Sequence, residues 1–257
     1  MGEVLIAATI LLQLGGNARW GTEFLIALVT LTAALTQRLT GFGSGLIPMA
    51  ILPGWVGIRT VTPLVALITA TVDMLMLGRY RAQIRPRAVY PLLAGMAFGI
   101  PLGILALRRL DERVVLGALG VVISLYALYA LFGFRLPRPN GRPWAWGVGF
   151  LAGLLGGAYN TSGPPLIVYG QAQEWPPDEF KANLQTLFIF NDGLVIAGHL
   201  LAHTITGVVA RVYLIALPAL VGGFLIGGRL DRFLNPDRFR MLVLVLLLVL
   251  GLRLVLG

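Results

Sequence analysis

Residues 156–167 read GGAYNTSGPPLI and place a polar turn between two apolar runs, at 144–159 and 164–170. Asn160-Thr161-Ser162 bring an amide and two hydroxyls directly before a Pro-Pro pair, and proline is tolerated in the first turn of a helix. This stretch therefore predicts that one helix ends and a second begins within a few residues, with polar groups beside the new helix start.

A second break lies at residues 36–48, TQRLTGFGSGLIP, where three glycines in five residues separate two apolar pieces. Backbone that is not helical persists at membrane depth only where it lines a cavity or is buried in protein. Free N–H groups at a helix start also favour anions. We expect the two breaks to form a binding site for an anion, with these residues as candidates: Gly43, Ser44, Gly45, Asn160, Thr161, Ser162 and Gly163.

Both breaks also have a purely structural interpretation. The first can be a tight helix hairpin, and the second a turn at the membrane surface, because Asn, Ser, Gly and Pro favour turns. Two basic residues, Arg38 before the first break and Lys181 after the second, are candidates to attract the anion. For Arg38, the alternative is a side chain that extends to the lipid headgroups.

The composition indicates an integral membrane protein. Of 257 residues, 57% are apolar and 12% charged, and the mean hydropathy is +0.84, which excludes an ordinary soluble domain and a disordered chain. A net charge of +9 in a soluble protein would suggest nucleic acid, but here the basic residues gather at the ends of apolar runs. The runs predict about eight full transmembrane helices at 22–39, 60–78, 87–107, 113–133, 144–159, 182–202, 206–228 and 239–256, plus two short pieces at 45–53 and 164–170.

An internal duplication is the simplest account of the two breaks. A shift of 120 residues aligns Trp55 with Trp175, and the tripeptide 109–111 (RLD) with 229–231. Suppose that each full span and the short piece after it form a hairpin, so that the chain changes sides of the membrane at each of the ten segments. Thirteen basic residues then lie on one side of the membrane and seven on the other. The positive-inside rule makes the first side cytoplasmic, so both termini are predicted outside and the two five-segment halves are inverted.

The predicted organisation has four parts. They are an N-terminal segment (1–20), a first membrane repeat (21–134), a linker (135–143) that reads RLPRPNGRP, and a second membrane repeat (144–257). Inverted repeats around broken helices are the architecture of many secondary transporters.

Three ionisable residues inside predicted spans are candidates for proton coupling: Asp73, Asp192 and His199. Asp192, His199 and His203 have the spacing i, i+7 and i+11 of one helix face, and Asp73 falls one position from the repeat mate of Asp192. The alternative is hydrogen bonding between helices. His199 and His203 also have metal-ligand spacing, but without an adjacent Glu or Cys we expect no metal site.

The stretches LTGFGSGLI (39–47) and GGAYNTSGPPLIVY (156–169) resemble the two signature stretches of the sulfite exporter TauE/SafE family of membrane transporters. Trp175, the prolines that follow it, and Phe180-Lys181 resemble the segment after the second signature. The likeness covers roughly residues 25–257. It implies export or uptake of sulfur-containing anions, such as sulfite or organosulfonates, across the cell membrane.

The sequence thus predicts a secondary transporter of a small anion, an exporter in the inner membrane, with no cofactor. The lipid bilayer and a second copy of the chain are candidate partners; nucleic acid is not. Two alternatives remain at this stage: an intramembrane enzyme that uses Asp192, His199 and Ser162, although it lacks G-x-S-x-G and H-E-x-x-H motifs, and a non-transporting membrane subunit.

Overall fold

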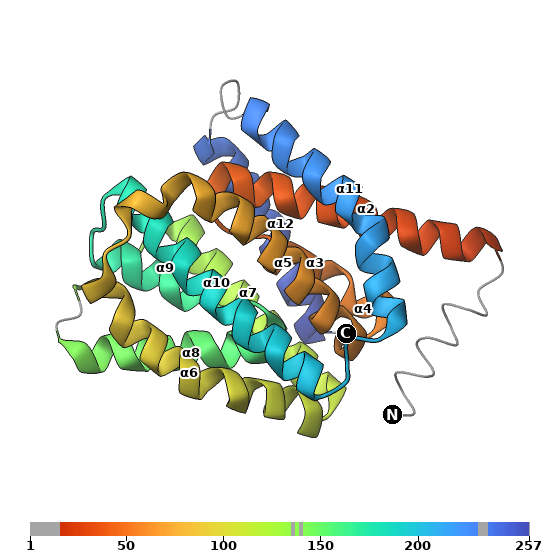
Figure 1. The fold of residues 1–257 in the computed structure, drawn as a ribbon, viewed down its shortest axis with the longest axis horizontal. Coiled ribbons are helices and arrows are strands. Elements are labelled where there is room, and N and C mark those ends of the chain that lie inside the picture. The colour runs from red at the N-terminus through yellow and green to blue at the C-terminus, as the bar shows by residue number, and fades with distance from the viewer. Residues whose placement is uncertain (1–15, 135–136, 139–140, 231–235, 257) are drawn as a thin grey trace.

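The computed structural model describes residues 16–134, 137–138, 141–230 and 236–256, and all regular structure within these ranges is helical (Figure 1). The predicted N-terminal segment (1–20) and linker (135–143) lie partly outside the described residues. The long helices are α2 (Gly16–Thr40), α5 (Ile58–Tyr80), α6 (Pro86–Arg109), α7 (Glu112–Phe132), α8 (Arg142–Tyr159), α10 (Pro177–Leu201), α11 (Gly207–Leu230) and α12 (Pro236–Leu256). The short ones are α3 (Leu46–Ile51), α4 (Pro53–Val56), the 3₁₀ turn η1 (Arg81–Gln83) and α9 (Gly163–Ala172).

The helix bounds follow local sequence signals. Proline occupies the first turn of α6, α9 and α10, where its missing N–H has no intrahelical partner to lose. Asp111 caps α7, since its side chain accepts a hydrogen bond from the Arg113 N–H at 2.9 Å. Gly133 ends α7 with a left-handed φ of 64°.

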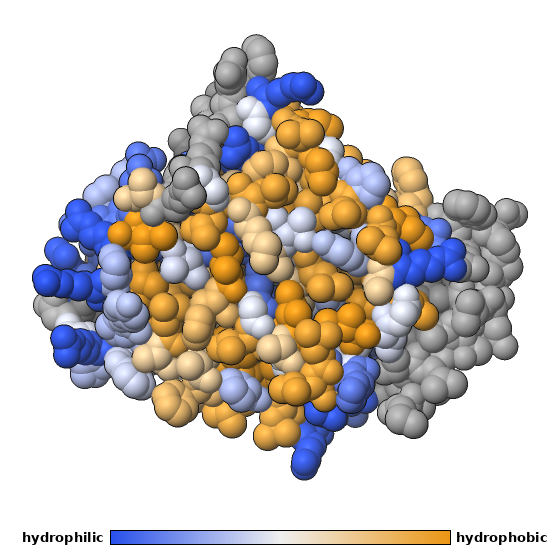
Figure 2. Space-filling view, in the orientation of Figure 1, coloured by the Kyte–Doolittle hydropathy of each residue, from blue (hydrophilic) through white to orange (hydrophobic). Residues whose placement is uncertain are grey.

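Seven helices in the described part of the chain are long and apolar enough to cross a membrane: α2, α5, α6, α7, α10, α11 and α12. The eighth long helix, α8, is not among these seven, because Arg142, Pro143 and several glycines make it less apolar than the others. Large apolar side chains such as Phe24, Leu201 and Leu256 are exposed. Apolar surface covers the middle of the face in Figure 2, while polar residues gather toward its edges, as a surrounding bilayer requires.

The helices pack in pairs that bring the two halves of the chain together. α6 packs against α8, α2 against α11, α7 against α12, and α5 against α10. In chain order, α2, α5, α6 and α7 of the first half correspond to α8, α10, α11 and α12 of the second. Exchanging each helix for its counterpart turns the pair α6–α8 into α11–α2 and leaves α5–α10 and α7–α12 unchanged. The pairing is compatible with the predicted inverted repeat.

Glycines allow the closest of these approaches. A Cβ at Gly95, Gly99 or Gly103 of α6 would overlap backbone atoms of α8, and one at Gly223 of α11 would overlap the Leu31 carbonyl of α2. These small residues form faces along which the helices pack closely. The pair formed by α5 and α10 also contacts the short helices α3 and α9.

Candidate functional site

The two helix breaks meet inside the protein. Residues 41–45 connect α2 to α3, and residues 160–162 connect α8 to α9. Gly45 and Asn160 touch at this junction, because a Cβ on Gly45 would overlap the carbonyl oxygen of Asn160. The first break therefore packs directly on the backbone of the second, which only glycine permits at residue 45.

Each break is held by hydrogen bonds to helices beside it. Gln37 of α2 accepts a 3.1 Å hydrogen bond from the Ser44 N–H through Oε1 and donates through Nε2 to Asp73 Oδ1 at 2.6 Å. Asn160 has a left-handed φ of 52°, and its Nδ2 donates to the Thr62 carbonyl at 2.9 Å. Both loops are thereby fixed to α5.

Two carboxyl groups lie at this junction, one from each half of the chain. Asp73 of α5 and Asp192 of α10 are 2% and 4% exposed, and their carboxyl groups lie close enough to share a hydrogen-bonded proton. Thr69, one turn before Asp73, donates to Asp192 Oδ1 at 3.0 Å. Asp192 Oδ2 is buried and has no hydrogen-bond partner within the described residues.

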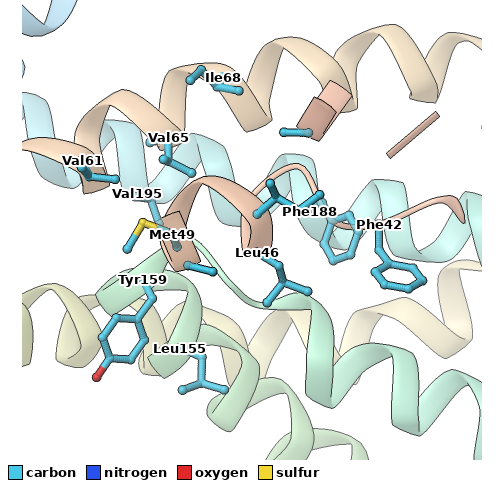
Figure 3. Packing of buried hydrophobic residues seen from close by; sticks show 14 of the residues in the cluster. Phe42, Leu46, Met49, Val61, Val65, Ile68, Leu155, Tyr159, Phe188 and Val195 are labelled. Atoms are coloured by element: carbon cyan, nitrogen blue, oxygen red, sulfur yellow. The ribbon is translucent and has the colours of Figure 1, made fainter. Parts of the chain in front are cut away.

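These groups line a small cavity of about 30 Å³ at the junction. That space holds one or two waters. Figure 3 shows Phe42, Leu46 and Phe188, three of the apolar lining side chains, in the surrounding core. The lining consists of Gln37, Phe42, Gly43, Ser44, Gly45, Leu46, Thr69, Asp73, Asn160, Thr161, Ser162, Gly163, Phe188, Asn191 and Asp192.

The structure thus brings together nine of the twelve residues singled out in the sequence. They are Gly43, Ser44, Gly45, Asp73, Asn160, Thr161, Ser162, Gly163 and Asp192. Sequence reasoning did not include Gln37, Thr69 and Asn191 among the site residues. Gln37 lies within the first break motif, and Thr69 lies four residues before Asp73 on the same helix face, so both carried a signal.

Two predicted basic residues are not in the lining. The Arg38 guanidinium lies over the Phe224 ring of α11, 4.9 Å from its centroid, and Nη1 is 3.9 Å from Met76 Sδ. Lys181 of α10 lies near the first break, since a Cβ on Gly41 would be 3.8 Å from Lys181 Cγ. The role of both residues in binding remains a prediction.

The histidines lie away from the cavity. His199 is buried near the end of α10, and its Nδ1 pairs with Thr204 Oγ1 at 2.8 Å. α10 ends at Leu201, so the expectation that His203 continues its polar face was wrong. His203 instead has a left-handed φ of 53° after the helix end.

The comparison with protein families agrees with this architecture. The model of the family described as "Sulfite exporter TauE/SafE" matches residues 26–254, nearly the whole chain. The chain belongs to this family. Its members are membrane transporters, so the chain is a multi-pass membrane transporter and not an enzyme.

Two relatives cover most of this TauE/SafE chain. A protein of Comamonas testosteroni named "Probable inner membrane transporter protein TsaS" is 30% identical over 74% of this chain and 81% of its own length. A protein of Cupriavidus necator named "Probable sulfite/organosulfonate exporter TauE" is 28% identical over 89% of this chain and 94% of its own length. No solved structure matches the chain significantly.

Proposed function

We propose that this chain exports a small sulfur oxyanion, sulfite or an organosulfonate, across the inner membrane, and that the anion binds where the two helix breaks meet. The names of the relatives support the substrate class and the membrane. The cavity between the breaks, whose lining includes polar residues of both, supports the location of the site.

Unpartnered polar atoms at the junction are the observation that carries the proposal. Thr161 Oγ1, Asn160 Oδ1 and Asp192 Oδ2 are buried without a hydrogen-bond partner in the described part of the chain. Only the Thr161 hydroxyl can donate to an oxyanion, whereas Asn160 Oδ1 and Asp192 Oδ2 are acceptors that need a water or a proton. An unsatisfied buried polar atom costs about 1–3 kcal/mol, so a ligand or water is expected there. The Thr161 hydroxyl, at the positive end of α9, is a suitable donor to an oxyanion, together with Ser44 and Ser162.

The cavity is narrower than its proposed ligand. Sulfite has four heavy atoms, more than a space for one or two waters accepts. The described conformation is therefore a closed state, and the breaks separate when the anion enters. The first break follows α2, which packs against α11, and the second follows α8, which packs against α6. Movement of these two helix pairs against each other opens the site, as in alternating access.

Two carboxyl groups beside an anion pose an electrostatic problem. Asp73, Asp192 and a bound oxyanion would put three negative charges in one apolar enclosure, which is unfavourable unless some are neutralised. We therefore propose that the anion binds together with protons on this carboxyl pair. His199 is seven residues from Asp192, about 10 Å along the helix, so a proton path between them requires water.

Arg38 and Lys181 are proposed to act through their charge from outside the lining.

The test is sulfite efflux from liposomes that contain the purified protein, compared between two matched variants. Thr161→Val removes a cavity hydroxyl at constant volume. Thr30→Val makes the same change at another buried, unpartnered threonine that is absent from the lining. Loss of a donor to a charged group costs about 1.5–3 kcal/mol, so Thr161→Val should weaken sulfite binding about ten-fold or more, and Thr30→Val should not. Equal affinity in both variants would move the site elsewhere.

A further inference from the structure

A second, larger cavity lies between α7, the end of α9 and the start of α12. Its volume is about 560 Å³, enough for an oxyanion with its hydration water. It is lined by Tyr129, Ala130, Gly133, Phe134, Arg138, Gln171, Ala172, Glu174 and Arg240.

One aromatic ring of the central cavity lies close to an arginine of this larger one. Phe42 lines the central cavity, and the Arg240 guanidinium, which lines the larger cavity, lies 5.9 Å from the centroid of the Phe42 ring. The edge of the same ring packs against Tyr126 of α7 at a centroid distance of 5.9 Å and an interplanar angle of 88°. Phe42 is thus held between Tyr126 of α7 and Arg240, in contact with groups that line both cavities.

The larger cavity carries the charge that an anion needs. Arg240 Nε is buried and makes no hydrogen bond to the described residues, while Arg138 is exposed, with its Nε donating to Gln173 Oε1 at 3.2 Å. The one carboxylate among the lining residues, Glu174, is exposed. A neighbouring cavity of about 390 Å³ shares Arg138 and adds Arg87 and Arg142. The arginines of the two cavities outnumber the one carboxylate, and a recess with excess positive charge concentrates anions.

From this arrangement we infer that the cavity is an oxyanion vestibule: the transported anion first binds near Arg240 and passes Phe42 to reach the central site. The inference rests on the proposed function for the identity of the anion. The four arginines of the two cavities belong to the side predicted to be cytoplasmic, where an exporter collects its substrate. Arg240 therefore binds and selects the anion. When the guanidinium pairs with the anion, it leaves its position over the Phe42 ring.

The absence of cysteine from the chain allows a test that needs no transport. Gln171→Cys places one thiol in the cavity lining. Its reaction rate is measured with two methanethiosulfonate reagents, one bearing a sulfonate and one a trimethylammonium group. The vestibule predicts that the sulfonate reagent is favoured, and that adding Arg240→Gln lowers its rate relative to the cationic reagent by about 3–10-fold. The effect should fade as salt rises to ~1 M, where the Debye length is about 3 Å.

Two control variants accompany this measurement. Arg253→Gln removes a charge thirteen residues further along α12, about 20 Å away, and should leave the preference unchanged. Arg240→Lys keeps the charge and should retain most of the preference for the sulfonate reagent. Retention in this variant would show that the loss in Arg240→Gln comes from the missing charge and not from misfolding. If Arg240→Gln and Arg253→Gln behave alike, or if salt has no effect, the vestibule is refuted.

Added anions and defined lipids identify the ligand. Sulfate and methanesulfonate should slow the sulfonate reagent in phosphatidylcholine vesicles. If they do not, or if phosphatidylglycerol alone abolishes the preference, the cavity holds lipid headgroups and the inference fails. Loss of sulfite efflux in the unmodified protein, with the labelling pattern intact, would instead refute the proposed substrate and leave the oxyanion site standing.

Discussion

Gly45 packs against the carbonyl oxygen of Asn160, so that a residue from the first helix break touches the backbone of the second across 115 positions of sequence. The contact fixes the relative position of the two halves at the centre of the bundle. Gly45 has an ordinary right-handed φ of −88°, so it is space rather than backbone strain that excludes a side chain here.

Gly45→Ala should therefore push the two breaks apart. We expect it to lower the free energy of unfolding by about 1–3 kcal/mol, as overpacking does elsewhere, and to impair sulfite efflux. Thermal unfolding in detergent and efflux from liposomes are the measurements. Gly117→Ala, in α7 with open space around its Cβ, is the control and should be neutral or slightly stabilising. Equal stability of the two variants would show that the breaks do not pack tightly in the working protein.

Asp192→Asn should abolish uptake driven by a pH gradient while anion exchange across the membrane continues. The amide keeps the shape and can still accept from Thr69, but it cannot bind and release a proton. Both assays must use the same liposomes, because misfolding would remove both activities. Asp178→Asn, on the exposed start of the same helix, should change neither. If flux in the unmodified protein ignores a pH gradient, Asp192 has a packing role.

Arg38→Gln should reduce sulfite affinity less than Thr161→Val does. The Arg38 side chain lies over Phe224 and alongside Gly227 and Gly228 of α11, so the variant mainly loses packing between α2 and α11. The expected signature is a lower unfolding temperature with affinity changed by about two-fold or less, or ~0.4 kcal/mol. A ten-fold loss of affinity at unchanged stability would place Arg38 in the binding site.

The asymmetry of basic residues predicts the orientation in the membrane. Reporter fusions after Arg87 and Arg138 should be cytoplasmic, while fusions after Arg109 and at the C-terminus should be outside. The measurement is the activity of reporters that function on only one side. The same side for the fusions at 87 and 109 would contradict the hairpin arrangement and with it the inverted repeat.

The sequence by itself determined the helices and their breaks. The apolar run 87–107 became α6 (Pro86–Arg109), and the short piece 164–170 became α9 (Gly163–Ala172). Local rules suffice here, because apolar length, proline in first turns, and glycine or asparagine at helix ends act within a few residues. The same local signals singled out Thr161 and Asp192 as polar groups in an apolar setting.

Only the tertiary structure decided which helix faces meet. It paired Asp73 with Asp192, added Gln37 and Thr69 to the site, and turned Arg38 toward α11 instead of the cavity. A transmembrane helix is apolar on every side, because residues that face lipid are as apolar as residues that face the protein core. Its sequence therefore has no amphipathic pattern that would identify the buried face. The choice of faces depends on close glycine contacts and buried hydrogen bonds between segments far apart in the chain, and these form only when the whole bundle packs.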